Sequence, residues 1–133
     1  MSRFIKEWLL SAEMDIKNIE KIIDDDFLSP IICFHAQQCV EKCFKALLED
    51  NEINIPKTHD LLRLFGMLKE IKHLKIKINL NILQRLNDFY VESRYPDEFG
   101  LLPNGKPTLE DAREFYDFAK MIYEDVKQLV KEE

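Results

Sequence analysis

Glycine and proline are scarce in this chain, with three and five residues among 133. All-β domains need many tight turns, in which these two residues are common, so their scarcity disfavours a turn-rich β architecture. No apolar run approaches the length of a membrane-spanning helix, and the N-terminus lacks the apolar segment of a signal peptide. We therefore expect a soluble, cytoplasmic protein that makes no membrane contact.

Cysteine is also rare, and its three residues, Cys33, Cys39 and Cys43, form no C-x-x-C pair. An odd number of cysteines suits a reducing compartment better than a disulfide framework. Cys39 and Cys43 stand four residues apart, but no second pair of ligands follows at zinc spacing. We predict buried thiols, with neither a metal nor a cofactor.

Positive charge is in deficit, because 19 basic residues face 25 acidic ones and the formal net charge is −6. Sequence-independent binding to nucleic acid depends on clustered lysine and arginine, so this balance argues against a protein that coats RNA or DNA. A site for RNA or a nucleotide would have to be a local pocket or lie in a partner. The chain also lacks a glycine-rich phosphate loop and the H-E-x-x-H and G-x-S-x-G motifs.

Helical periodicity is what the chain has in abundance. Apolar residues recur at spacings of three and four, and Ser2, Ser29, Thr58 and Thr108 stand where helices could begin. Asp111, three residues after Thr108, would complete a capping box. We predict one domain over residues 1–133, an all-α, antiparallel up-and-down bundle of about five helices. They are residues 2–23, 29–49, 58 to between 72 and 77, 80–93, and 108 to the C-terminus.

The last predicted helix is apolar over a wide arc, which Phe115, Phe118, Ile122 and Leu129 broaden. This arc is larger than one groove between helices requires. Either a second subunit covers part of it, or the helix is covered on several sides by its own chain.

The second predicted helix carries a polar row of Gln37, Glu41 and Lys45, four residues apart, beside its core-facing arc. Such a row could hold a phosphate through Lys45 and position a hydroxyl through Glu41. An ordinary Glu–Lys helix pair, contributing a few tenths of a kcal/mol, is the alternative interpretation.

Two histidines lie near this row in the sequence. His35, like Lys42, falls on the opposite side of the second helix, so we expect it to be exposed or at a subunit contact. His59 follows Thr58 in the predicted first turn of the third helix, and we expect it to make a structural hydrogen bond.

The most unusual segment runs from Ser93 to Asp97. Pro96 disfavours the α conformation at Tyr95, so the fourth helix should stop there and present Arg94 at its end. A guanidinium in that position could bind a phosphate with two parallel hydrogen bonds. It could equally pair with Asp97 or cap helix carbonyls and so fix the loop.

Several segments, taken in order, resemble the HEPN family over nearly the whole chain. They are Phe34 to Gln38 with Glu41, Lys42, Lys45 and Ala46; Pro56 to Leu61; Tyr90 with Ser93 to Asp97; and the last helix with Ala112 and Ala119. The resemblance implies a compact α-helical bundle that forms a homodimer.

Many HEPN proteins are metal-independent endoribonucleases of toxin–antitoxin or defence systems. They use an arginine followed after four to six residues by a histidine, across a dimer cleft. Arg94 matches the arginine, but Phe99, Gly100 and Leu101 occupy the histidine positions, and no histidine occurs after His73. The general acid/base of that reaction is therefore missing.

Other HEPN proteins are non-cleaving partners of a separately encoded minimal nucleotidyltransferase. In similar helical domains a glutamate and a lysine line the nucleotide cleft, as Glu41 and Lys45 could here. We therefore predict a homodimeric partner of a nucleotidyltransferase that is not an enzyme by itself. Its nucleotide or RNA-phosphate pocket would be lined by Gln37, Glu41, Lys45, Arg94 and Tyr95. A divergent HEPN ribonuclease with a site near Arg94, and a purely structural dimerisation module, are the alternatives.

Overall fold

The computed structural model describes residues 2–94 and 106–130, and for residues 91–94 it describes the backbone alone. This part of the chain is helical and contains no strand, which confirms the predicted all-α bundle of five α-helices. The elements are α1 (Arg3–Ile22), the 3₁₀ turn η1 (Asp26–Leu28), α2 (Ser29–Asp50), α3 (Leu61–Lys69), α4 (Leu80–Arg94) and α5 (Leu109–Leu129).

Two of the predicted helix starts are confirmed by their caps. The Ser2 hydroxyl accepts a hydrogen bond from the Ile5 N–H at 3.3 Å. The Thr108 hydroxyl accepts from the Asp111 N–H at 3.0 Å, and the Asp111 carboxylate accepts from the Thr108 N–H at 3.1 Å. The capping box predicted at the start of α5 is therefore present.

The predicted start of the third helix was wrong by two residues. Asp60, not Thr58, caps α3, and its carboxylate accepts from the N–H groups of Leu62 and Arg63 at 3.0 and 3.3 Å. The Thr58 hydroxyl instead accepts from the Asp60 N–H at 3.1 Å. As a result His59 lies in the connection before α3 rather than in its first turn.

Loss of the cap on α5 should have a measurable cost. The Thr108→Ala substitution is expected to lower the free energy of unfolding by about 1 kcal/mol, because it leaves the Asp111 N–H without its side-chain acceptor. Thr108→Ser keeps the hydroxyl and serves as the control. Equal melting temperatures for Thr108→Ala and Thr108→Ser would contradict this role.

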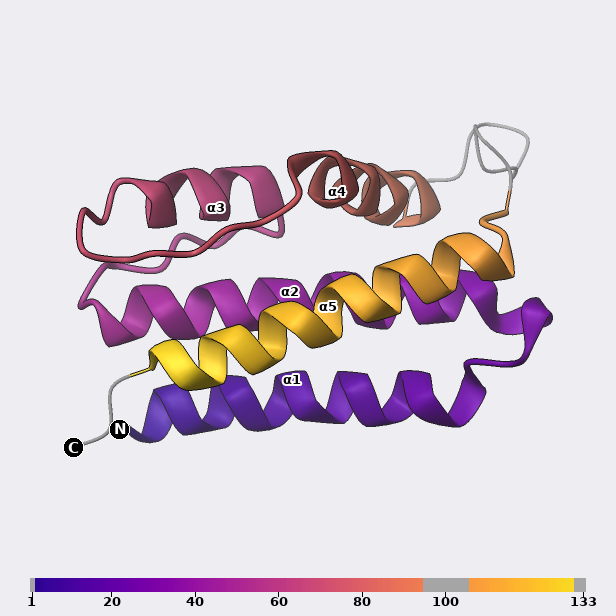
Figure 1. Cartoon of the computed structure of the whole chain (residues 1–133), viewed down its shortest axis with the longest axis horizontal. Helices are drawn as coiled ribbons and strands as arrows, with labels where there is room; N and C mark the ends of the chain where they lie inside the picture. Colours follow the sequence, from indigo (N-terminus) through magenta and orange to yellow (C-terminus); the bar gives the residue numbers. More distant parts are fainter. Residues whose placement is uncertain (1, 95–105, 131–133) are drawn as a thin grey trace.

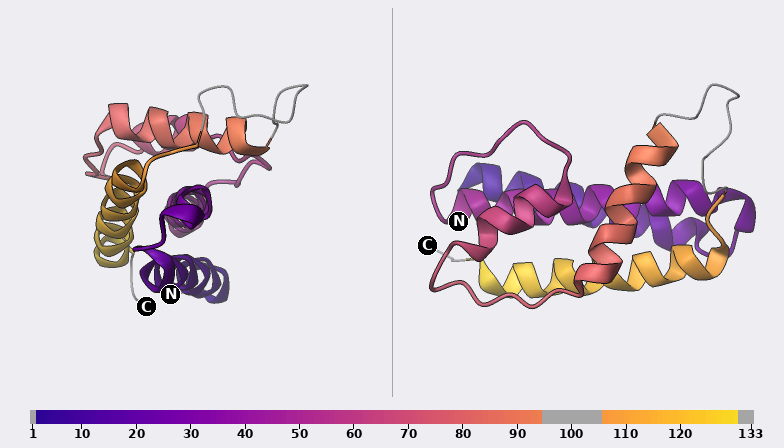
Figure 2. Two further views of the ribbon diagram at one scale, coloured as in Figure 1. Left: turned by 90° about the vertical axis from the view of Figure 1, so that its right-hand side faces the viewer. Right: turned by 90° about the horizontal axis from the view of Figure 1, so that it is seen from above.

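Helices α1, α2 and α5 lie side by side along the long axis of the molecule (Figure 1). α1 runs antiparallel to α2, whereas α5 runs in the same direction as α2. Two contacts fix this second pairing: the Ser29 hydroxyl donates to the Pro107 carbonyl at 2.7 Å, and the Cys39 thiol donates to the Ala119 carbonyl at 3.9 Å. α3 and α4 cover the opposite side of α2 from α1, and Figure 2 shows α4 crossing the long helices at a steep angle.

The core is built around α2, and the apolar arc of α5 packs into it. Phe115, Phe118 and Ile122 are at most 4% exposed within this single chain. The Phe115 ring meets the Phe89 ring of α4 edge to face at 5.5 Å between centroids. Of the two explanations for the wide arc, coverage by the chain's own helices accounts for these three residues.

None of the described helices combines the length and the apolar character needed to cross a bilayer.

Candidate functional site

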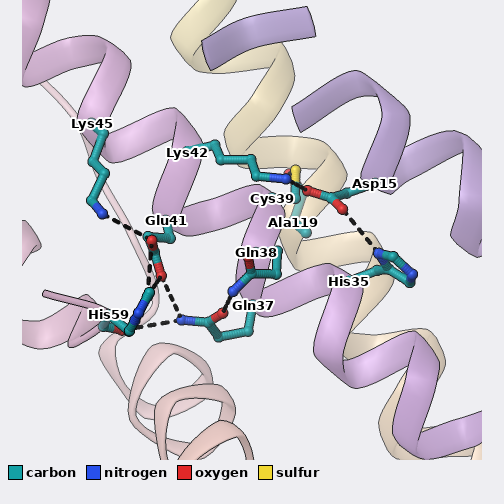
Figure 3. Close-up of polar contacts among 10 residues, drawn as sticks. All are labelled: Asp15, His35, Gln37, Gln38, Cys39, Glu41, Lys42, Lys45, His59 and Ala119. Atoms are coloured by element: carbon teal, nitrogen blue, oxygen red, sulfur yellow. Dashed lines mark hydrogen bonds and ion pairs between the residues drawn. The ribbon is translucent and has the colours of Figure 1, made fainter. Parts of the chain in front are cut away.

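The polar row of α2 is buried. Gln37, Glu41 and Lys45 are 0%, 5% and 7% exposed, respectively, although their spacing alone would also fit a solvated helix face. The Lys45 ammonium donates to Glu41 Oε2 at 2.9 Å, and the Gln37 amide donates to Glu41 Oε1 at 3.3 Å. The row is thus a connected network centred on one carboxylate (Figure 3). The Trp8 ring of α1 lies 5.7 Å from Lys45 Nζ, so the ammonium is held between a carboxylate and an aromatic ring.

His59 completes this network from the connection between α2 and α3. Its Nδ1 lies 3.0 and 3.2 Å from the two carboxylate oxygens of Glu41, and its backbone carbonyl accepts from the Gln37 amide at 3.1 Å. Figure 3 shows His59 in contact with both Glu41 and Gln37, which are neighbours on α2. The hydrogen-bonding role predicted for His59 is confirmed, although its partner on α2 could not be known from the sequence. We refer to Gln37, Glu41, Lys45 and His59 as the Glu41 network.

The chemistry of the carboxylate fixes the direction of these bonds. An ionised carboxylate only accepts hydrogen bonds, so Lys45, Gln37 and His59 all donate to Glu41. Nδ1 of His59 therefore carries a proton, and in the neutral ring Nε2 is the acceptor. The His59 side chain is 53% exposed, in contrast to the 7% of the Glu41 side chain. His59 is thus the part of the Glu41 network that reaches the surface.

A second carboxylate on α1 holds the other side of α2. Asp15, which is 5% exposed, contacts Nδ1 of His35 at 2.9 Å and the Lys42 ammonium at 2.7 Å. His35 and Lys42 thus lie on the face of α2 away from the Glu41 network, as the helical wheel predicted. Of the two expectations for His35, full exposure was wrong, because its side chain is 22% exposed and is tied to α1 within the same chain; a subunit contact stays a prediction.

The end of α4 lies next to the Glu41 network. The Tyr90 ring is 5.8 Å from the His59 ring and 6.1 Å from the Phe34 ring. Arg94 is the last residue of α4, four residues and roughly 6 Å along the helix beyond Tyr90. The Glu41 network and α4 therefore meet through the rings of His59 and Tyr90. The Arg94 side chain and all of Tyr95 lie outside the described residues.

A buried amide that the sequence did not indicate helps to set this arrangement. Asn87 of α4, 8% exposed, accepts from the Leu61 N–H at 3.0 Å and donates to Asp60 Oδ1 at 3.2 Å. It therefore fixes α4 against the start of α3, directly after His59. No spacing in the sequence relates position 87 to position 60, so the contact could not be predicted.

The three cysteines are free and buried, which confirms the prediction of buried thiols. Burial raises the pKa of the Cys33 thiol to about 12, so this side chain stays protonated at neutral pH. Within residues 2–94 and 106–130, no three His, Cys, Asp or Glu side chains are placed to hold a metal ion together.

The fold agrees with the comparison to known proteins. The family model of the HEPN domain matches residues 5–129, and the chain belongs to the HEPN family. Among its relatives is the protein named "Putative toxin MJ1304" of Methanocaldococcus jannaschii, which is 33% identical over 140 residues, covering 98% of this chain and 90% of the relative. The crystal structure of ST0689, an archaeal HEPN homologue, matches with a TM-score of 0.69 and 29% identity over 98% of this chain and 100% of that one.

Proposed function

We propose that this HEPN protein is a non-cleaving, homodimeric partner of a separately encoded nucleotidyltransferase. In this role it would bind a nucleotide or RNA phosphate where the Glu41 network meets the end of α4. The observation that carries the proposal is the burial of Glu41 and Lys45, at 5% and 7% exposure. Desolvating two charges costs as much as their attraction returns, or more, so stability alone gives little reason to keep this pair.

The proposal assigns different roles to the two cations of the site. Lys45 is already paired with Glu41 at 2.9 Å and sets the shape of the network from within. Arg94, at the end of α4, would supply the guanidinium that binds phosphate with two parallel hydrogen bonds. Tyr95 would flank it. Gln37 would act by holding the His59 carbonyl, at 3.1 Å from its amide.

The relatives support a two-component setting. One of them is named "Putative toxin MJ1304", and the toxin of a toxin–antitoxin pair is neutralised by a separate partner. A nucleotidyltransferase as that partner fits a chain that has a buried Glu–Lys pair but lacks the histidine expected after Arg94. Co-expression with the nucleotidyltransferase from a neighbouring reading frame, followed by size-exclusion chromatography, tests the pairing. Separate elution of the two proteins at micromolar concentration would contradict it.

Nucleotide binding is tested by calorimetry with ATP and GTP on the chain alone and together with its partner. Arg94→Ala is expected to weaken binding by about tenfold or more, because a hydrogen-bonded charge pair is lost. Arg63→Ala is the matched control, since Arg63 is an exposed arginine on α3. Absence of binding at millimolar nucleotide by wild type, with and without the partner, would exclude the pocket. Cleavage of single-stranded RNA by wild type but not by Arg94→Ala would instead favour the ribonuclease alternative.

A further inference from the structure

We propose that His59 recognises a ribose hydroxyl of the bound nucleotide through its Nε2 atom. This inference rests on the proposed nucleotide pocket and names the chemical group that the pocket recognises. Neither the family assignment nor the residues chosen from the sequence give His59 a binding role.

The contacts of the His59 imidazole indicate which ring nitrogen carries the proton. Both carboxylate oxygens of Glu41 lie within 3.2 Å of Nδ1, and one of them also accepts from the Lys45 ammonium at 2.9 Å. A carboxylate with such partners accepts hydrogen bonds and donates none, so the proton of the neutral ring is on Nδ1. Nε2 then presents a lone pair, and its ligand must be a hydrogen-bond donor such as a hydroxyl.

Nε2 of His59 is directed away from Glu41. The two nitrogens lie on different edges of the imidazole ring, so a ring anchored through Nδ1 to a buried carboxylate directs Nε2 away from it. Figure 3 shows the Nδ1 edge of His59 directed at Glu41. Because the His59 side chain is 53% exposed, the edge that bears Nε2 lies on the solvent side of the Glu41 network. The histidine is therefore held rigidly on its inner side and is open to a ligand on its outer side.

The His59 ring lies close to α4. The Tyr90 ring lies 5.8 Å from the His59 ring, and Arg94 follows one helical turn later. The end of α4 thus lies one helical turn, roughly 6 Å along the helix, beyond the contact between Tyr90 and His59. If the phosphate binds at the end of α4, the sugar hydroxyls are the donors closest to it, and the base lies further away. A ribose hydroxyl is therefore the donor that fits Nε2 best.

The other polar side chains of the Glu41 network bond to one another. Gln37 donates to Glu41 Oε1 at 3.3 Å and to the His59 carbonyl at 3.1 Å, and Lys45 donates to Glu41 Oε2 at 2.9 Å. They hold the histidine in place and do not need to rearrange when a ligand arrives. Glu41 is therefore a positioning residue in this scheme, and His59 is the residue that touches the ligand.

Calorimetry with ATP and 2′,3′-dideoxy-ATP tests the inference. Wild type is expected to bind ATP about three- to tenfold more tightly than the dideoxy nucleotide, the effect of one hydrogen bond. The variant His59→Asn keeps a donor near the position of Nδ1 but has no counterpart of Nε2, so it should bind both nucleotides with the same weakened affinity. His73→Ala is the matched control, because His73 lies in the connection between α3 and α4 and bonds to Asn51 at 2.9 Å. It should retain the preference of wild type.

The outcomes separate this inference from the proposed function. Equal affinity of wild type for ATP and dideoxy-ATP overturns the role of His59 and leaves the pocket standing. Absence of binding to either nucleotide overturns the pocket and the role of His59 together. Nitrogen-15 NMR of the imidazole gives a measurement that needs no ligand: the proton is expected on Nδ1 in wild type. A ring that carries a proton on Nε2, in the neutral or in the imidazolium form, would overturn the inference even if nucleotides bind.

Discussion

Replacing Glu41 with alanine is expected to lower the free energy of unfolding by about 3–5 kcal/mol, as measured by urea denaturation. The substitution leaves the Lys45 ammonium buried at 7% exposure without its carboxylate. It also removes the acceptor for Gln37 and for Nδ1 of His59. Because domains of this size are stable by about 5–15 kcal/mol, the expected loss is a large fraction of the total stability.

Two controls make the origin of this effect clear. The double substitution Glu41→Ala with Lys45→Met removes both charges and keeps much of the buried volume, so it should recover a large part of the loss. Glu7→Ala removes the carboxylate of an exposed i,i+4 pair with Arg3 and should cost no more than about 0.5 kcal/mol. Equal costs for Glu41→Ala and Glu7→Ala would mean that the Glu41 network is an ordinary surface ion pair.

The helices could be predicted from the sequence because their signals are local. Ser2, Thr108 and Asp111 lie within three or four residues of the groups that they cap, and the apolar periodicity of α2 and α5 spans a few turns. The start of α3 was predicted wrongly at Thr58 because the same local signal was used there. Thr58 and Asp60 can each cap a helix, and only the folded chain shows that the Asp60 carboxylate takes the N–H groups of α3.

The candidate site was predictable only in part. The spacing of Gln37, Glu41 and Lys45 placed them on one row of α2, and this is what the structure has. Their burial depends on what covers the row, which is α1 through Trp8 and the connection through His59. Contacts between residues 41 and 59, or 87 and 60, produce no periodic pattern in a single sequence. They depend on how the chain folds back on itself and not on a local spacing.

The histidine beside α4 illustrates this limit. A search for a histidine shortly after Arg94 fails, because none follows His73. The fold nevertheless brings His59, 35 residues earlier in the chain, within 5.8 Å of Tyr90 at the end of α4. The absence of a histidine shortly after Arg94 in the sequence therefore does not mean that no histidine lies near α4 in space.

Replacing Phe115 with alanine is expected to lower the free energy of unfolding by about 3–5 kcal/mol, because it opens a cavity in the core. Phe115 is 0% exposed, meets the Phe89 ring at 5.5 Å and lies beneath the Arg85 guanidinium at 5.2 Å. Phe27→Ala is the matched control, since Phe27 is 81% exposed and its truncation should change the free energy of unfolding by about 0.5 kcal/mol or less.

The same variant distinguishes the two explanations for the apolar arc of α5. Since Phe115 is 0% exposed within the single chain and has no surface to offer a second subunit, Phe115→Ala should destabilise the fold without changing the oligomeric state. Light scattering of wild type and variant at tens of micromolar, in the absence of denaturant, provides the measurement. A variant that dissociates while its free energy of unfolding stays that of wild type would show that this part of the arc belongs to a subunit interface.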